Sequence, residues 1–267
     1  MDLGLAGAKA VVTGGSKGMG LAIAETIAAE GASVAVMARD QVALDAAAER
    51  LRAAGAPEAW GISVDMGNAE SIAAGFAKVA QRWGDLNALV HTIGPGDGYF
   101  EEMDDSDWEA AFALGTMSGV RSIRASLPLL RAADWARIVT LSAHSIQRQN
   151  PRIVAYTASK AALSSVTKNL SKSLAKDGIL VNCVCPGTIV TASFTEALKD
   201  VLAADGLDAE DPVDVMKWID ANFHQPCDLG RAGLPEEIAS ITTYLASRRN
   251  GYVTGATVNV DGGSDFI

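Results

Sequence analysis

Two side chains that could move a proton, Tyr156 and Lys160, lie four residues apart in Tyr156-Thr157-Ala158-Ser159-Lys160. On a helix this spacing places the phenol and the ammonium group on one face. A neighbouring positive charge lowers the pKa of a tyrosine from its ordinary value of about 10. Tyr156 is therefore a candidate general acid toward a carbonyl oxygen, or a base toward an alcohol. The pair alone does not identify an enzyme, because Tyr and Lys at this spacing are common on exposed helices.

A glycine-rich segment, Thr13 to Gly20, offers a second kind of site between an apolar strand-like run and a helix-like run. Gly14 allows the positive φ of a tight turn, while Gly18 and Gly20, without Cβ, let a pyrophosphate approach the helix start. The spacing is G-x-x-x-G-x-G and not the general dinucleotide fingerprint G-x-G-x-x-G. From this motif alone, a glycine-rich turn without a ligand remains the alternative.

Charges near the next strand bear on the choice between NADP and NAD. In dinucleotide-binding folds a carboxylate at the end of the second strand binds the ribose, whereas a nearby Arg accommodates a 2′-phosphate. Here Ala38 stands where the carboxylate is expected, Arg39 follows, and Lys17 adds a second cation, which favours NADP(H) over NAD(H). Alternatively both cations are solvated and Asp40 partly cancels Arg39. Asp65 either accepts from the adenine amino group or caps a turn.

The elements that must position these residues alternate between strand and helix along the chain. The apolar runs lack alternation, as strands covered on both faces do, so the fold class is α/β with a doubly wound parallel sheet. We expect one domain over residues 1–267. The expected strands are Ala8–Thr13, Ser33–Ala38, Glu58–Val64, Ala88–Thr92, Arg137–Leu141, Ile179–Cys185 and Thr257–Val260. The expected helices are Gly18–Glu30, Gln41–Ala54, Ala69–Arg82, Ser106–Ala133 with interruptions near Gly115 and Pro128, and Ala155–Lys176.

Composition narrows the class of ligand. The chain has 267 residues, 49% hydrophobic and 20% charged, and a formal net charge of -10 without a basic stripe. This argues against nucleic acid and anionic membranes and favours a small-molecule substrate. The absence of an N-terminal targeting pattern and of a long apolar run predicts a cytoplasmic protein. Cys183 and Cys185 alternate along one strand as small buried residues would, so no disulfide or metal site is predicted.

Residues 191–230 break the alternation, because they contain no obvious strand and many acids. A long insertion after the carboxyl end of a strand lies where such folds bind ligands, so this segment is a candidate substrate lid. A helical surface excursion without a functional role is the alternative.

Taken together, motifs along nearly the whole chain resemble the short-chain dehydrogenase/reductase family. They are Thr13–Gly20, the Tyr156/Lys160 pair, Pro186-Gly187-Thr188-Ile189, Arg231-Ala232-Gly233 with Pro235-Glu236-Glu237-Ile238-Ala239, and Val260-Asp261-Gly262-Gly263. The resemblance implies a single Rossmann-like sheet of about seven strands with helices on both faces, and hydride transfer between nicotinamide and a carbonyl or alcohol. It also implies a homo-oligomer, with a tetramer favoured because the closing Asp-Gly-Gly strand often lies at that interface.

The same resemblance assigns site residues. Tyr156 is the implied acid/base, and Lys160 is implied to hold the nicotinamide ribose and lower the pKa of Tyr156. The implied cofactor-binding residues are Gly14, Ser16, Lys17, Gly18, Met19, Gly20, Arg39, Asp65, Met66, Gly94, Tyr156, Lys160, Pro186, Gly187 and Ile189.

The chain departs from the family at three places. The usual Asn-Asn-Ala-Gly reads His91-Thr92-Ile93-Gly94, and the usual Asn seven residues after Trp108 is Gly115. In the family this Asn holds a water of the proton relay, which a glycine cannot do. At Gly115 we therefore expect either a kink in the helix, or a water or substrate in the volume that the side chain vacates. If a water there completes the relay, Gly115→Asn should raise the rate at most modestly.

The family's substrate-orienting serine usually precedes the tyrosine by thirteen residues, where this chain has Ala143. Ser142, fourteen residues before Tyr156, ends a strand and is our prediction for the catalytic serine. Ser145 and His144 are close enough to replace it, although a lone loop histidine is more often merely solvated.

Two classes of function remain. An NADP-linked carbonyl reductase or alcohol dehydrogenase is favoured by Tyr156 and Lys160, and Trp218, Phe194, Ile146 and Met117 suggest an apolar substrate. A degenerate nucleotide-binding member, acting as a sensor or assembly partner, is favoured by the loss of the family's Asn.

Overall fold

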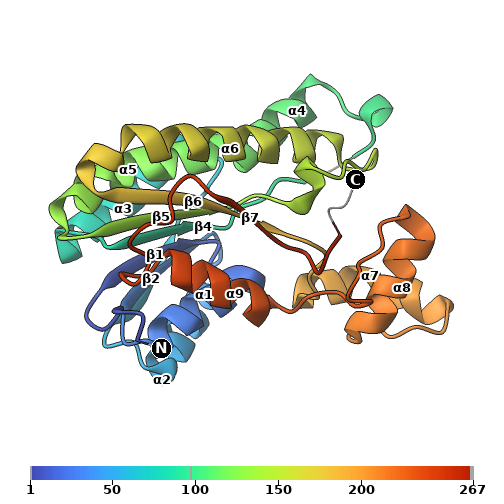
Figure 1. The fold of residues 1–267 in the computed structure, drawn as a ribbon, viewed down its shortest axis with the longest axis horizontal. Helices are drawn as coiled ribbons and strands as arrows, with labels where there is room; N and C mark the ends of the chain where they lie inside the picture. Colours follow the sequence, from blue (N-terminus) through green and yellow to red (C-terminus); the bar gives the residue numbers. More distant parts are fainter. Residues whose placement is uncertain (1, 97, 265–267) are drawn as a thin grey trace.

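A seven-stranded parallel sheet forms the centre of the computed structural model, which describes residues 2–96 and 98–264 (Figure 1). Its strand order is β3-β2-β1-β4-β5-β6-β7, and every neighbouring pair is parallel. The strands are β1 (Lys9–Thr13), β2 (Ser33–Ala38), β3 (Ala59–Ser63), β4 (Ala88–His91), β5 (Ala136–Leu141), β6 (Ile179–Pro186) and β7 (Thr257–Val260). Each predicted strand is therefore confirmed, with ends that differ by no more than one residue.

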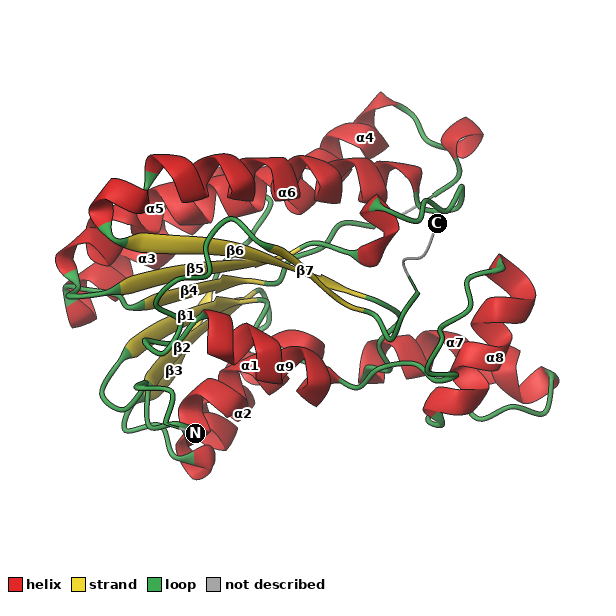
Figure 2. Cartoon of the chain, viewed as in Figure 1, coloured by secondary structure: helices red, strands yellow, loops and turns green. Residues whose placement is uncertain are grey.

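Helices cover both faces of the sheet, and each face has its own core (Figure 2). Side chains of β1 alternate between them, since Ala10 and Val12 lie in one core and Val11 in the other. One core packs against α1 (Gly18–Ala29), α2 (Gln41–Ala54) and α9 (Pro235–Leu245), and the other against α3 (Ala69–Trp83), α5 (Ser118–Ala132) and α6 (Val154–Ser173). The Rossmann-like α/β fold is thus confirmed.

The long helical stretch after β4 differs in detail from the prediction. It consists of α4 (Asp105–Phe112), a π-helical turn (Ala113–Met117) and α5 without a break between them. The irregularity at Gly115 is present, but Pro128 lies inside α5 and does not end it, so the predicted interruption there is wrong.

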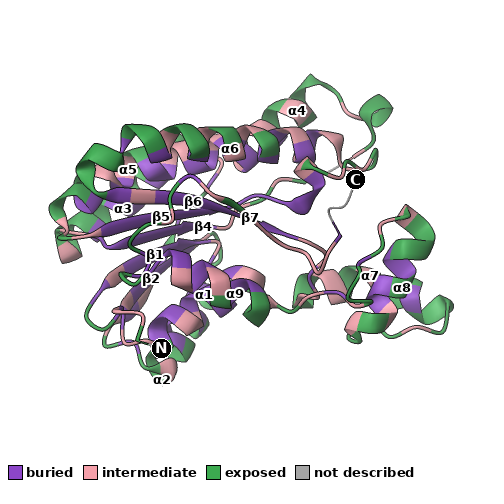
Figure 3. Cartoon of the chain, viewed as in Figure 1, coloured by how far each residue is buried: buried purple, intermediate pink, exposed green. Residues whose placement is uncertain are grey.

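Residues 191–230 form a small helical layer of their own, with α7 (Ala192–Ala204) and α8 (Pro212–Phe223) joined by a short loop (Figure 3). Leu202, Val215 and Trp218 belong to a third hydrophobic cluster, and Phe194 packs against it. Trp218 and Phe194 therefore serve the core of this insertion, and our expectation that they indicate an apolar substrate loses its basis.

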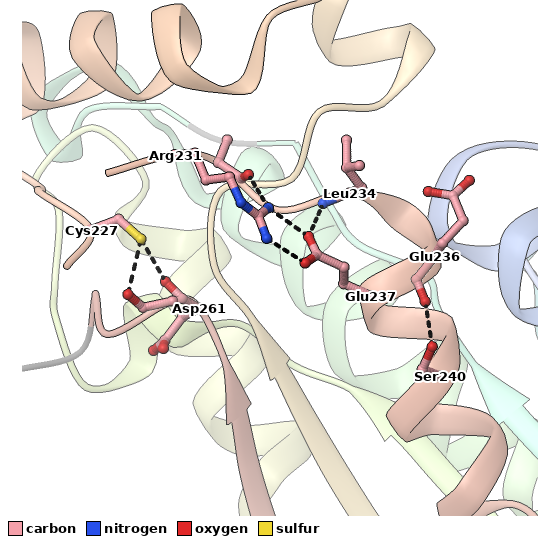
Figure 4. Close-up of polar contacts among 9 residues, drawn as sticks. Cys227, Arg231, Leu234, Glu236, Glu237, Ser240 and Asp261 are labelled. Atoms are coloured by element: carbon pink, nitrogen blue, oxygen red, sulfur yellow. Dashed lines mark hydrogen bonds and ion pairs between the residues drawn. The ribbon is translucent and has the colours of Figure 1, made fainter. Parts of the chain in front are cut away.

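The insertion is fastened where it returns to the sheet (Figure 4). Arg231 forms two hydrogen bonds of 2.8 and 2.6 Å to the carboxylate of Glu237 in α9, which also accepts from the amide of Leu234. The pairing with Arg231 lowers the pKa of Glu237 to about 2. Nearby, the Cys227 thiol donates to the carbonyl oxygens of Asp261 and Gly262. These contacts join the end of the insertion to α9 and to the segment after β7.

Two expectations about single features can be compared with the structure. Cys183 and Cys185 are buried, as their strand pattern predicts, and Cys227 is buried as well. Among the described residues, no helix has both the length and the apolar character that crossing a membrane requires.

The π-helical turn at Gly115 is packed tightly against α6. A Cβ built on Gly115 would lie 2.7 Å from Cβ of Ser159, closer still to its Oγ, and 3.2 Å from Cγ of Pro95. Thr116 fixes this approach by donating to the carbonyl oxygen of Ser159 at 2.8 Å. Atoms of Ser159 and Pro95 fill the space that a side chain at Gly115 would need. Close helix packing therefore accounts for the glycine, and the alternative of a gap for a water or substrate at this position is wrong.

We predict that Gly115→Asn lowers the free energy of unfolding by about 1–3 kcal/mol, because overpacking outweighs the gain from replacing a helical glycine. Urea unfolding measures it, with Gly96→Ala as the control, since a Cβ at Gly96 would have no atom within 4 Å. Adding Ser159→Gly to the Asn variant should restore part of the loss. An Asn variant as stable as the natural protein would contradict the packing argument.

Candidate active site

A cleft of about 630 Å³ opens at the carboxyl ends of the strands, beside the glycine-rich turn. Gly14 has the expected positive φ of 74°, and a Cβ on Gly20 would lie 2.8 Å from the carbonyl carbon of Gly14. Only glycine permits this approach of helix α1 to the turn. The predicted cofactor residues that line the cleft are Gly14, Ser16, Lys17, Gly18, Met19, Gly20, Arg39, Asp65, Met66 and Gly94.

The acid beside the two cations, Asp40, also lines the cleft, but its carboxylate is hydrogen-bonded elsewhere. The Asp40 carboxylate caps helix α2 by accepting from the amides of Val42 and Ala43 at 2.9 and 3.2 Å. Within the described part of the chain, neither Lys17 nor Arg39 forms an ion pair. Both remain able to meet a phosphate in the cleft.

Asp65 follows β3 at the same edge and does cap a turn, because its Oδ1 accepts from the amide of Gly67 at 2.9 Å. Its carboxylate also lines the cleft, so the two alternatives for Asp65 are compatible in geometry.

Lys160 is buried behind the cleft and held by the ends of two strands. Its ammonium group donates to the carbonyl oxygens of Ile93 and Leu141, at 2.7 Å each. The Tyr156 ring lies beside it, with the ammonium nitrogen 5.9 Å from the ring centroid. A Cβ on Gly94 would lie 3.5 Å from Cε2 of Tyr156 and 3.7 Å from Cε of Lys160. Gly94 therefore keeps the space in front of the pair open to the cleft.

Burial lowers the pKa of Lys160 to about 8, against an ordinary value near 10.5. The side chain is only 2% exposed, and the charged form keeps two carbonyl partners but loses most of its hydration. Lys160 is thus a cation at neutral pH that is poised to lose its proton slightly above it.

The serines near Tyr156 have different surroundings. Ser142 ends β5, and its hydroxyl donates its single proton to the carbonyl oxygen of Lys160 at 2.9 Å. Ser145 lies in the short 3-10 helix His144–Ile146 and accepts from the hydroxyl of Thr157 at 3.1 Å. His144 is buried and donates from Nδ1 to the carbonyl oxygen of Pro186 at 3.2 Å. Ser142 therefore supports helix α6, and among described residues no acceptor takes the proton of Ser145.

His91, where the family has Asn, is fully buried between the glycine-rich turn and helix α5. The Ser118 hydroxyl donates to the carbonyl oxygen of Leu114, so it must accept from Nε2 of His91, at 3.0 Å. Nδ1 then accepts from the hydroxyl of Thr13, at 2.8 Å. Burial, with the charge of Lys160, lowers the pKa of His91 to about 3, so it stays neutral and acts as a structural bridge.

The remaining predicted residues lie at the end of β6, and sequence reasoning missed several cleft residues. Pro186 ends the strand, Gly187 packs against Asp261 of the segment after β7, and Ile189 lines a separate cavity of about 300 Å³. The cleft is also lined by Val64, Thr92, Ala110, Ala113, Leu114, Thr191 and Ser193. Val64 and Thr92 end predicted strands and were detectable from that position, whereas the others depend on how α7 and the segment from α4 to the π-helical turn pack.

Comparison with known proteins identifies the class. A sequence profile described as enoyl-(acyl carrier protein) reductase matches residues 14–265. The chain therefore belongs to the short-chain dehydrogenase/reductase family, and it is an NAD(P)-dependent oxidoreductase of that family.

Its relatives match along almost their whole length. Dehydrogenase/reductase SDR family member 4 of Caenorhabditis elegans is 32% identical over 259 residues, which cover 96% of this chain and 95% of the relative. The 3-oxoacyl-(acyl-carrier-protein) reductase of Escherichia coli is 32% identical over 259 residues, covering 97% of both. The L-sorbose reductase of Gluconobacter frateurii, solved with NADPH and L-sorbose, is 31% identical, with a TM-score of 0.91 over 99% of this chain and 98% of that one.

The lowered pKa of Lys160 predicts a pH dependence of stability. Between pH 8 and 10.5 the folded lysine is neutral while the unfolded one still binds a proton, so the cost of burying the charge is relieved as pH rises. Between pH 7 and 10, the natural protein should gain about 2–3 kcal/mol relative to Lys160→Met. Urea unfolding of both proteins at the two pH values measures it. Parallel pH profiles would contradict the buried cation.

Proposed function

We propose that this chain transfers a hydride between NADP(H) and a carbonyl or secondary alcohol of a small molecule, with Tyr156 as general acid/base. The observation that carries the proposal is the placement of Tyr156 and Lys160 behind Gly94, at the end of the cleft that begins with the glycine-rich turn. Bound nicotinamide dinucleotide supplies or accepts the hydride. The residues of this chain bind the cofactor and transfer the proton.

Three groups divide the work in this proposal. The amides of the turn and the start of α1 bind the pyrophosphate, and Lys17 and Arg39 bind the 2′-phosphate. Lys160, fixed by Ile93 and Leu141, keeps a positive charge beside the Tyr156 phenol and favours its ionised form. Tyr156 then gives its proton to the carbonyl oxygen during reduction, or takes it back during oxidation.

We also propose a homotetramer, which the resemblance implies. Support comes from β7, an edge strand whose residues are all partly or fully exposed in the single chain. The substrate lid remains a proposal too, supported by Thr191 and Ser193 at the start of the insertion, which line the cleft.

We predict that NADPH binds more tightly than NADH by about 1–3 kcal/mol at low ionic strength, because both cations reach the 2′-phosphate. Isothermal titration with both cofactors measures it. Lys17→Ala and Arg39→Ala should each reduce the preference, whereas Lys172→Ala, an exposed lysine on α6, should not. Equal affinities for the two cofactors would refute the NADP assignment.

We predict that Tyr156→Phe lowers kcat by about 10²- to 10⁴-fold with cofactor affinity nearly unchanged, since only the proton donor is lost. Lys160→Ala should impair both turnover and cofactor binding. Steady-state rates on a panel of ketones and fluorescence titration of NADPH measure the two effects. Wild-type turnover in the Phe variant would remove Tyr156 from the mechanism and favour the nucleotide-binding alternative.

The same assay separates the two serines. If Ser142 contacts the substrate, Ser142→Ala lowers kcat with little loss of stability. If it only supports α6, Ser145→Ala carries the loss of rate.

A further inference from the structure

Arg152 forms no ion pair within the described residues, and it lies four residues before Tyr156. It lies in the loop between the short helix carrying His144 and Ser145 and helix α6, which carries Tyr156. This loop does not line the cofactor cleft. The loop leads directly into the first turn of α6, so Arg152 precedes Tyr156 by only four residues, and we take this side, away from the cofactor cleft, as the substrate side.

Two aromatic rings from other segments hold this guanidinium. Its central carbon lies 4.6 Å from the ring centroid of Phe223 and 5.8 Å from that of Tyr99. Phe223 ends helix α8 of the insertion, and Tyr99 follows Gly94, which faces Tyr156. The segment after β4, the loop before α6 and the end of α8 thus meet at Arg152. Stacking uses the faces of a guanidinium and leaves its edge, with the N–H groups, free to donate.

Acidic residues are frequent in the segment that follows Tyr99, and Arg152 forms an ion pair with no described acid. Six of the nine residues from 101 to 109 are acidic, and this segment begins two residues after Tyr99. Yet no ion pair or side-chain hydrogen bond of Arg152 occurs within the described residues, whereas Arg148, four residues earlier, donates to the carbonyl oxygens of Ser264 and His224. Arg148 thus holds the end of α8 in place, whereas the guanidinium N–H groups of Arg152 donate to no described residue.

We propose that Arg152 binds an anionic group of the substrate, a carboxylate or a phosphate, and so selects carbonyl compounds that carry one. The fork of guanidinium N–H groups matches the paired oxygens of either group. This inference rests on the proposed reductase function and adds the class of substrate.

Matched substrate pairs test the proposal. The first pair is acetoacetate and its ethyl ester, and the second is fructose 6-phosphate and fructose. For each pair we compare kcat/KM of the charged and the neutral member in the natural protein, in Arg152→Ala and in Arg152→Lys. Arg152→Ala should lower the charged-to-neutral ratio by about 10- to 100-fold in one pair, which identifies the carboxylate or the phosphate. Arg152→Lys should retain part of it, because it keeps the charge but not the fork.

Arg148→Ala is the matched control, because it weakens the fastening of α8 and should change both members of a pair alike. An Arg152→Ala variant that leaves the ratio unchanged in both pairs, or that behaves as Arg148→Ala does, overturns the proposal and makes Arg152 a structural clamp.

Binding of the charged probes to protein saturated with NADP⁺, measured by titration calorimetry, separates this inference from the proposed function. Binding that depends on Arg152 without turnover of any probe would refute the reductase function and keep the anion site. Turnover with a charged-to-neutral kcat/KM ratio that Arg152→Ala leaves unchanged would refute the anion site and keep the reductase function. Neither turnover nor Arg152-dependent binding would refute both.

Discussion

The burial of one ammonium group, that of Lys160, constrains the rest of the site. A charge that is nearly removed from water must be hydrogen-bonded, and here the carbonyl oxygens of Ile93 and Leu141 do this. They stand at the carboxyl ends of β4 and β5, where parallel strands leave carbonyl groups without sheet partners. The position of Lys160 is therefore set by the sheet as well as by α6. Because Tyr156 lies one turn earlier on the same helix, the contacts that fix Lys160 also fix the position of Tyr156.

Further contacts depend on this arrangement. Helix α6 must approach the sheet closely, and Ser142 donates to the carbonyl oxygen of Lys160 from the end of β5. On its other side, α6 meets the π-helical turn, where Gly115 leaves room for Ser159. π-Helical turns within helices occur often at functional sites. In this chain the turn places a glycine opposite Ser159, the residue that precedes Lys160, so the departure from the family allows close packing against helix α6.

The fold and the cofactor cleft could be predicted because their signals are local. Apolar runs mark the strands, and the glycine at position 14 has the positive φ that a tight strand-to-helix turn requires. The serine assignment and the reading of Trp218 depended on directions of side chains that spacing does not give. Fourteen residues separate Ser142 from Tyr156, but only the three-dimensional structure shows its proton directed at α6. An apolar residue such as Trp218 is expected both in a substrate pocket and in a hydrophobic core, so its type does not distinguish them. Its packing in one cluster with Leu202 shows that it belongs to the core of the insertion.

The distribution of charge reconciles an acidic chain with an anionic cofactor. Residues 101–109 and 191–230 together carry more negative charge than the net -10 of the whole chain, so the remainder is net positive. The remainder contains the glycine-rich turn, Lys17 and Arg39, which face the cleft. Since the fields of exposed charges are largely screened beyond about 10 Å at 0.1 M salt, the local cations and helix-start amides dominate the electric field inside the cleft. The net charge of the chain therefore says little about the cofactor.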